Sequence, residues 1–142
     1  MLAHAASREA EVAVNTMLGK EDEMSYDNCP GVIYTNPEVA YVGATAEELD
    51  HKGRPFQVVE IPFSYSGRFM AETNREQSLC KLIVDKEDQT LIGCHLLGPY
   101  VSEIIITAGI MIERKMTLEE IKRQIFPHPT VAEIIREGIF LF

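Results

Sequence analysis

Two strongly hydrophobic stretches separated by a few polar residues stand out in the second half of the chain. LCKLIVD (Leu79 to Asp85) and LIGCHLLG (Leu91 to Gly98) flank the polar residues Lys86 to Gln89. Two β-rich runs joined by a short polar connection predict a β-hairpin. Other β-branched and aromatic stretches are also expected to be extended: VIYT (32–35), VAYVG (39–43), PFQVVEIPF (55–63) and, within a polar turn region, GRFMAE (67–72).

Patterns typical of helices occur at the start of the chain and at several later positions. Small and apolar residues recur on one face from Leu2 to Met17, and Gly19 is the expected stop. Three capping boxes, in which a threonine is followed three residues later by a glutamate, predict further helix starts. They are Thr45 with Glu48 before a helix over 46–52, Thr117 with Glu120 before a short helix to about 124, and Thr130 with Glu133 before a final helix over 131–139.

The segment Ser102 to Lys115 predicts a helix that is apolar on nearly all sides. Such a helix is expected to be buried on most sides, which in a domain of this size requires a whole sheet or a second subunit. If two such helices pack closely in a dimer, Gly109 is a position where a larger side chain would weaken the dimer, and a purely internal contact at Gly109 is the alternative. With mixed helices and hairpin-close strands, the pattern predicts an α+β fold, an antiparallel sheet with helices packed on one side.

Composition narrows the classes of function. The 142 residues are 46% hydrophobic and carry a net charge of −9 without any basic run, which argues against nucleic acid as a partner. No apolar stretch reaches membrane-spanning length, and the N-terminus lacks the pattern of a secretory signal. Three cysteines without metal-ligand spacing are interpreted as reduced thiols of a cytoplasmic protein. No metal site and no glycine-rich phosphate loop are expected.

Candidate chemistry is concentrated in QIFPHPTVAE, residues 124–133. His128 lies between Pro127 and Pro129, and the His128-Pro129 bond is of the type that can be cis. A carboxylate from Glu133 would fix the imidazole tautomer and leave the other ring nitrogen as a base, able to take a proton from a thiol. On spacing alone, however, the simpler interpretation is that Glu133 only caps the final helix.

Three segments together carry a resemblance: PGVIYTNPEVAYVG (30–43), LIGCHLLGPYVSEII (91–105) and FPHPTVAE (126–133). They resemble the C-terminal interface domain of dihydrolipoamide dehydrogenases, flavin-dependent disulfide oxidoreductases, and the match runs in order along essentially the whole chain. Glutathione reductases are similar around HPT but differ around PEVA. The resemblance implies that His128 is the active-site base, that Glu133 is its paired carboxylate and that the His128-Pro129 peptide is cis.

The resemblance also implies a division of the chain. Residues 1–19 correspond to the last helix of an FAD-binding domain, 20–29 to a linker and 30–142 to the interface (dimerisation) domain. Met1, Leu2, Ala3 and His4 then match the stretch that lies against FAD. The family's redox-active cysteines and dinucleotide fingerprints are expected upstream, so the chain is expected to be the final third of a longer enzyme.

The full-length enzyme would use FAD and NAD to oxidise protein-bound dihydrolipoamide, as a homodimer in which this histidine completes the partner's active site. Its other partners would be lipoyl domains of 2-oxo acid dehydrogenase or glycine cleavage complexes. The isolated chain is expected to be inactive and to bind no cofactor. Phe126 and Pro127 replace the family's common His-Ala before the histidine, a departure that leaves the base in place. The alternatives are a non-catalytic, free-standing dimerisation module and the same domain of another disulfide reductase, such as glutathione reductase.

Overall fold

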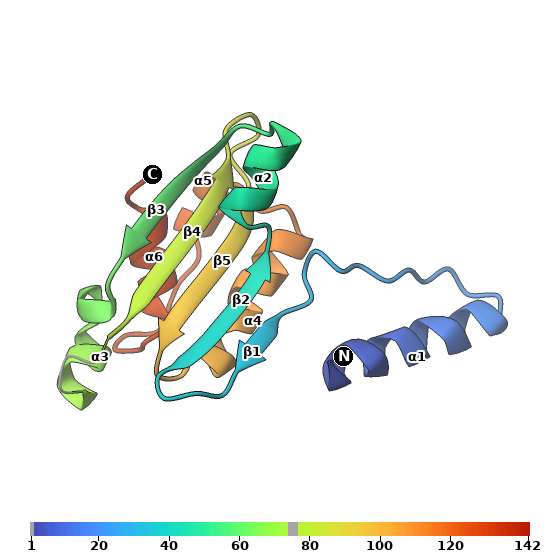
Figure 1. Cartoon of the computed structure of the whole chain (residues 1–142), viewed down its shortest axis with the longest axis horizontal. Helices are drawn as coiled ribbons and strands as arrows, with labels where there is room; N and C mark the ends of the chain where they lie inside the picture. The colour runs from blue at the N-terminus through green and yellow to red at the C-terminus, as the bar shows by residue number, and fades with distance from the viewer. Residues whose placement is uncertain (1, 74–76) are drawn as a thin grey trace.

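A computed structural model describes residues 2–73 and 77–142, and in these residues five strands form one antiparallel sheet (Figure 1). The strand order is β1-β2-β5-β4-β3. The strands are β1 (Gly31–Ile33), β2 (Glu38–Gly43), β3 (Phe56–Ile61), β4 (Leu79–Asp85) and β5 (Leu91–Gly98). The helices are α1 (Ala3–Met17), α2 (Ala46–Lys52), the 3-10 turn η1 (Phe63–Tyr65), α3 (Gly67–Glu72), α4 (Val101–Glu113), α5 (Leu118–Lys122) and α6 (Glu133–Ile139).

The predicted hairpin is confirmed as β4 and β5, next to each other in the middle of the sheet. Alternate residues of β4, among them Cys80, Leu82 and Val84, are completely buried on the face that carries the core. Leu82 pairs with Cys94 of β5, and β2 and β3 extend the sheet on either side. The apolar residues that alternate along the sequence of β4 therefore lie together on one face of the sheet.

Helices α4, α5 and α6 lie on that one face (Figure 1). α4 packs on β2 and β5, and α6 packs on β3 and β4. Gly138 of α6 allows this close approach, because a Cβ there would lie 2.6 Å from Leu82 Cδ1. The predicted α+β class with an antiparallel sheet is confirmed, but not all helices lie on one side, because α2 lies on the opposite face (Figure 1).

The predicted character of the Ser102 to Lys115 helix needs one correction, and the structure decides between the two alternatives for Gly109. α4 buries residues such as Ile105 and Met111, but Ile106 and Ile110 are 53% and 55% exposed, so one stripe of the helix is open. Gly109 does not face outward, because a Cβ there would lie 3.4 Å from the Asn28 carbonyl oxygen and 3.8 Å from a methyl group of Val42. The close packing at Gly109 is therefore internal to the chain.

The prediction that GRFMAE is extended is wrong, because these residues form helix α3. Ser66 caps the helix by accepting a hydrogen bond from the Phe69 amide at 3.3 Å. Phe69 is then buried edge-on against Phe63, with ring centroids 5.6 Å apart. Burial of two aromatic rings outweighs the polar, turn-like local pattern.

Helix α1 lies apart from the sheet (Figure 1), and none of its fifteen described residues is buried. The segment that follows returns alongside the helix. The Asp22 carboxylate accepts hydrogen bonds from Arg8 and from Asn15 (2.7 Å), and the Tyr26 hydroxyl donates to Glu9 at 2.9 Å. α1 is thus attached through polar contacts to its own linker. The division at residues 19 and 29 stays a prediction.

Candidate active-site histidine

His128 lies in the loop between α5 and α6, and its peptide bond to Pro129 is cis. The imidazole Nδ1 is 2.9 Å from Glu133 Oε1 and 3.2 Å from Oε2. The histidine side chain is 77% exposed, whereas that of the glutamate is only 16% exposed. The structure therefore brings the two predicted site residues together, with the carboxylate shielded behind an accessible ring.

Glu133 performs both roles that its spacing suggested. While Oε1 binds the imidazole, Oε2 accepts a hydrogen bond from the Thr130 backbone N–H at 2.8 Å. The capping box itself is only half formed. The Thr130 hydroxyl donates to the Pro127 carbonyl oxygen at 2.8 Å instead of capping the helix, and α6 begins at Glu133 rather than at residue 131. The same carboxylate therefore pairs with the imidazole and bonds the backbone just before α6.

The electrostatic setting keeps Glu133 ionised. Partial burial acts to raise the pKa of this carboxyl group, but the Thr130 N–H, the hydrogen bond and charge of His128 and the charge of Arg136 together hold the pKa below its ordinary value. An ionised carboxylate only accepts hydrogen bonds, so the Nδ1 that faces it carries the proton. In the neutral ring, Nε2 is then the unprotonated nitrogen.

That second nitrogen is available for chemistry. Among residues 2–73 and 77–142, no group is within hydrogen-bonding distance of His128 Nε2. His95 and His4 differ in this respect, because His95 Nε2 bonds the Ala44 carbonyl oxygen (3.0 Å) and His4 Nε2 bonds that of Pro30 (2.7 Å). His128 thus combines an oriented ring with an open basic nitrogen.

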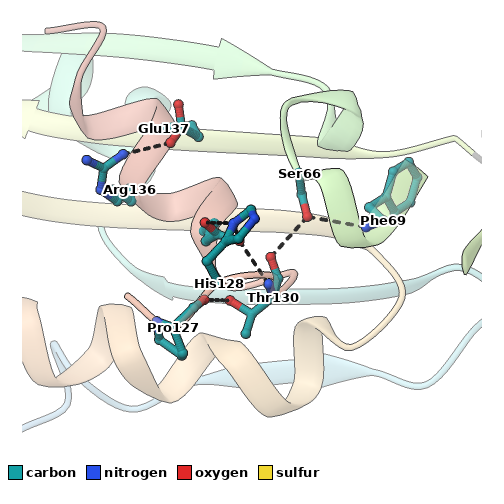
Figure 2. Close-up of polar contacts among 8 residues, drawn as sticks. Ser66, Phe69, Pro127, His128, Thr130, Arg136 and Glu137 are labelled. Atoms are coloured by element: carbon teal, nitrogen blue, oxygen red, sulfur yellow. Dashed lines mark hydrogen bonds and ion pairs between the residues drawn. The ribbon is translucent and has the colours of Figure 1, made fainter. Parts of the chain in front are cut away.

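Ser66 also contributes to this site, although sequence reasoning did not single it out. Its hydroxyl donates to the Thr130 carbonyl oxygen at 3.0 Å while it caps α3, and Figure 2 shows it beside the loop that carries His128. A serine three residues before a large apolar residue is a weak helix-cap signal that would have revealed α3. The contact with Thr130 joins residues 64 positions apart and leaves no local signal.

Cys80 and Cys94 are not candidates for a nucleophile here. All three cysteines are free thiols in the described part of the chain, as expected. Burial raises the pKa of Cys80 to about 12, and burial together with the neighbouring Cys80 raises the pKa of Cys94 well above its ordinary value. Both remain protonated at neutral pH and are packed in the core.

Of the predicted flavin-facing residues, Met1 lies outside the described residues. Leu2 precedes α1, and Ala3 and His4 form its first turn. No side chain of the described chain caps this end of the helix, and no acidic residue lies in its first turn. Its unpaired backbone N–H groups and positive dipole end suit an acceptor group of a cofactor. The His4 ring itself is directed to Pro30.

Residues 2–73 and 77–142 contain neither a metal-binding cluster nor a membrane-spanning helix. No cluster of three or more histidine, cysteine, aspartate or glutamate side chains is arranged to hold a metal ion. No helix in this part of the chain is both long and apolar enough to cross a bilayer.

Comparison with known proteins decides the family. Residues 29–139 match the family described as pyridine nucleotide-disulphide oxidoreductase, dimerisation domain. The chain belongs to this family. The matched region contains the whole sheet, the open stripe of α4 and the His128 loop, so these features belong to a dimerisation domain of disulfide oxidoreductases.

Curated relatives agree with this assignment. The chain is 41% identical to dihydrolipoyl dehydrogenase 3 of Pseudomonas putida over 97% of its own length and 29% of that protein. It is 38% identical to a leghemoglobin reductase of Glycine max, again over 97% of its length and 26% of that protein. The chain therefore spans less than a third of either relative.

Solved structures share the fold. LpdA from Mycobacterium tuberculosis superposes with a TM-score of 0.89 over 99% of this chain and 30% of that protein, at 20% identity. The HOCl-induced flavoprotein disulfide reductase RclA from Escherichia coli superposes with a TM-score of 0.80 over 92% of this chain and 30% of that protein, at 25% identity.

Proposed function

We propose that the chain is the dimerisation domain of a dihydrolipoyl dehydrogenase and supplies that enzyme with its active-site base, His128. The observation that carries the proposal is the His128–Glu133 pair, in which an ionised carboxylate orients Nδ1 and leaves Nε2 exposed. The resemblance at HPT-x-x-E and the 41% identity to a bacterial dihydrolipoyl dehydrogenase support it.

The chemistry assigned to the pair is proton transfer. Nε2 accepts the proton of a dihydrolipoamide thiol, the S–H bond breaks, and the resulting thiolate is the nucleophile for a disulfide elsewhere in the full-length protein. The imidazolium formed in this step is stabilised by Glu133, which lies 2.9 Å from Nδ1. A positioned general base contributes about 10²–10⁴-fold to rate.

FAD, when bound by the full-length protein, would receive the electron pair from the dithiol and pass it to NAD. This chain's own part would be one edge of the flavin site, the uncapped start of α1 at Leu2, Ala3 and His4 together with Met1. The His4 ring is engaged with Pro30, so backbone groups rather than the imidazole would face the cofactor. The chain offers no glycine-rich phosphate loop, and we expect it to hold neither FAD nor NAD alone.

Association with a second copy is the other half of the proposal. Ile106 and Ile110 form an apolar stripe on the side of α4 opposite the sheet, each more than half exposed. Closed two-fold pairs are the commonest soluble assemblies, and a self-complementary helix stripe suits such a pair. The partners of the assembled enzyme would be lipoyl domains of 2-oxo acid dehydrogenase or glycine cleavage complexes. The free thiols support a reducing compartment, for which we propose the cytoplasm.

The test is complementation. The chain is mixed with a fragment that carries the FAD-binding, NAD-binding and redox-disulfide domains of a dihydrolipoyl dehydrogenase, and lipoamide-dependent NADH oxidation is measured. Restored activity that falls at least about 100-fold in His128→Ala agrees with a general base. A complex confirmed by sedimentation but without activity would instead identify a non-catalytic dimerisation module. Activity with glutathione disulfide but not with lipoamide would identify a different disulfide reductase.

A further inference from the structure

Ser66 places a buried hydroxyl between two parts of the chain. The residue is 1% exposed and precedes α3. Its oxygen accepts a hydrogen bond from the Phe69 N–H at 3.3 Å and donates one to the Thr130 carbonyl oxygen at 3.0 Å. Figure 2 shows both bonds, one inside α3 and one directed to the loop of His128.

The residue type fits this double task. Capping α3 requires only an acceptor, which aspartate or asparagine would provide equally well. A hydroxyl is different because it donates and accepts at the same atom, whereas a carboxylate only accepts. Threonine has the same hydroxyl but adds a methyl group, which a site with 1% exposure has little room to accept. Serine is thus the side chain that meets both requirements in a closed space.

Thr130 connects Ser66 to the rest of the loop through hydrogen bonds. Its carbonyl oxygen is held by Ser66, its N–H donates to Glu133 Oε2 at 2.8 Å, and its hydroxyl donates to the Pro127 carbonyl oxygen at 2.8 Å. Every polar group of the residue is therefore engaged. The same glutamate then bonds His128 Nδ1 at 2.9 Å. A continuous hydrogen-bonded path leads from Ser66 to the imidazole.

The far end of this path is rigid. Ser66 donates its backbone N–H to the Phe63 carbonyl oxygen at 2.8 Å. Phe63 and Phe69 are 0% and 2% exposed and pack edge-to-face, so the segment on either side of Ser66 is fixed in the core. An exposed loop attached to a buried, close-packed anchor loses much of its freedom to move.

We propose that Ser66 is a positioning residue for His128, acting through Thr130 and Glu133 to hold the imidazole in one orientation and one tautomer. The role of the oriented ring as a base rests on the proposed function. The positioning itself is a property of this chain and is measurable without flavin, substrate or a second domain.

The experiment compares Ser66→Ala, Ser66→Gly and Ser78→Ala in the 142-residue chain. Glycine caps a helix almost as well as serine, so Ser66→Gly removes the donor to Thr130 while leaving α3 capped. Ser78 is the matched control, because its hydroxyl also accepts from a backbone N–H of the same region, that of Phe63 at 3.1 Å, but does not contact the His128 loop. The readouts are amide hydrogen exchange at Thr130 and the imidazole ¹⁵N chemical shifts of His128.

In both Ser66 variants, we expect the Thr130 amide to exchange about tenfold faster, the factor that corresponds to one net hydrogen bond. The His128 ¹⁵N shifts should move from those of the Nδ1–H tautomer toward those of a mixture. Ser78→Ala should change neither. Wild-type values in folded Ser66→Gly, or an equal change in Ser78→Ala, would overturn the proposal. If His128→Ala spared catalysis in the complemented enzyme, the proposed function would fail while these NMR results would still stand.

Discussion

At the scale of single residues, one carboxylate links helix α6 to the candidate base. Both oxygens of Glu133 lie within hydrogen-bonding distance of His128 Nδ1, with Oε1 the nearer, and Oε2 also accepts from the Thr130 N–H. If Glu133 only capped the helix, the imidazole of His128 would be free to rotate. If Glu133 only paired with His128, the Thr130 N–H would have no partner. Because glutamine keeps an acceptor oxygen but carries no charge, the charge of Glu133 and its hydrogen-bonding capacity can be separated by substitution.

Glu133→Gln removes the charge and retains most of the hydrogen-bonding capacity. We expect the free energy of unfolding to fall by no more than about 1 kcal/mol, a helix cap's worth, while the His128 ring loses its preference for the Nδ1–H tautomer. Imidazole ¹⁵N shifts and thermal unfolding check the two parts. Glu137→Gln, on the same helix but paired with Arg136, is the control. Identical tautomer populations in all three proteins would leave Glu133 as a cap only.

Acid should remove the contribution that the ionised Glu133 carboxylate makes to the stability of the fold. Its pKa in the folded chain is below the ordinary value, so the unfolded chain binds more protons in this range and stability rises with pH. The contribution is complete above the ordinary pKa, about 4.3, and is lost as pH falls through the folded-state pKa. The stability difference between wild type and Glu133→Gln should therefore narrow below about pH 4. Unfolding midpoints from pH 6 to pH 3 measure it, and a constant difference would contradict the prediction.

At the scale of elements, α4 covers the sheet with one side and leaves an apolar stripe open on the other. One side of the helix packs on β2 and β5, and the open side carries Ile106 and Ile110. Exposed isoleucines on a helix are unfavourable in water unless another surface covers them. The two faces can be tested independently, because a change on the open side leaves the internal packing intact.

Ile110→Glu should weaken self-association and spare the fold. An isoleucine that becomes buried contributes about 1.5–3 kcal/mol, so the dissociation constant should rise at least about tenfold. Sedimentation equilibrium measures the association, and circular dichroism checks the fold. Val14→Glu is the matched control, because Val14 is 50% exposed on α1 against 55% for Ile110. Equal loss of association in both variants, or a wild-type chain that is monomeric at high concentration, would contradict the assignment of the interface.

Gly109→Leu does not test this interface, because the structure shows the internal contact that the sequence had left open as an alternative. The added side chain would press on the Asn28 carbonyl oxygen and on Val42 of β2. The expected result is a loss of stability from overpacking, typically about 1–3 kcal/mol.

At the scale of the whole molecule, the proposed function assigns to the chain a base and a dimerisation surface but only one edge of a flavin site. We expect the purified chain to retain no FAD, because the few residues at the start of α1 cannot replace a phosphate-binding loop. Flavin absorbance after incubation with FAD and dialysis measures retention, with a full-length dihydrolipoyl dehydrogenase as the positive control. Stoichiometric flavin on the chain would contradict the prediction.

The amino-acid sequence determined most of the elements and the core of the site. The alternation in 79–98 predicted the central hairpin, and the capping boxes at Thr45 and Thr117 are present with both of their hydrogen bonds. The spacing of Thr130 and Glu133 predicted a helix cap, and the resemblance at HPT-x-x-E implied the contact between His128 and Glu133 and the cis bond before Pro129, both of which are present. These features depend on neighbours within a few residues, so a local pattern records them.

Tertiary structure alone decided the rest. GRFMAE is helical because Phe69 finds Phe63 in the core, and the Thr130 hydroxyl leaves its expected cap for the Pro127 carbonyl oxygen. The bond from Ser66 to Thr130 joins residues 64 positions apart. Burial and hydrogen bonding between distant segments depend on where the whole chain places them, and no short window of residues contains that information.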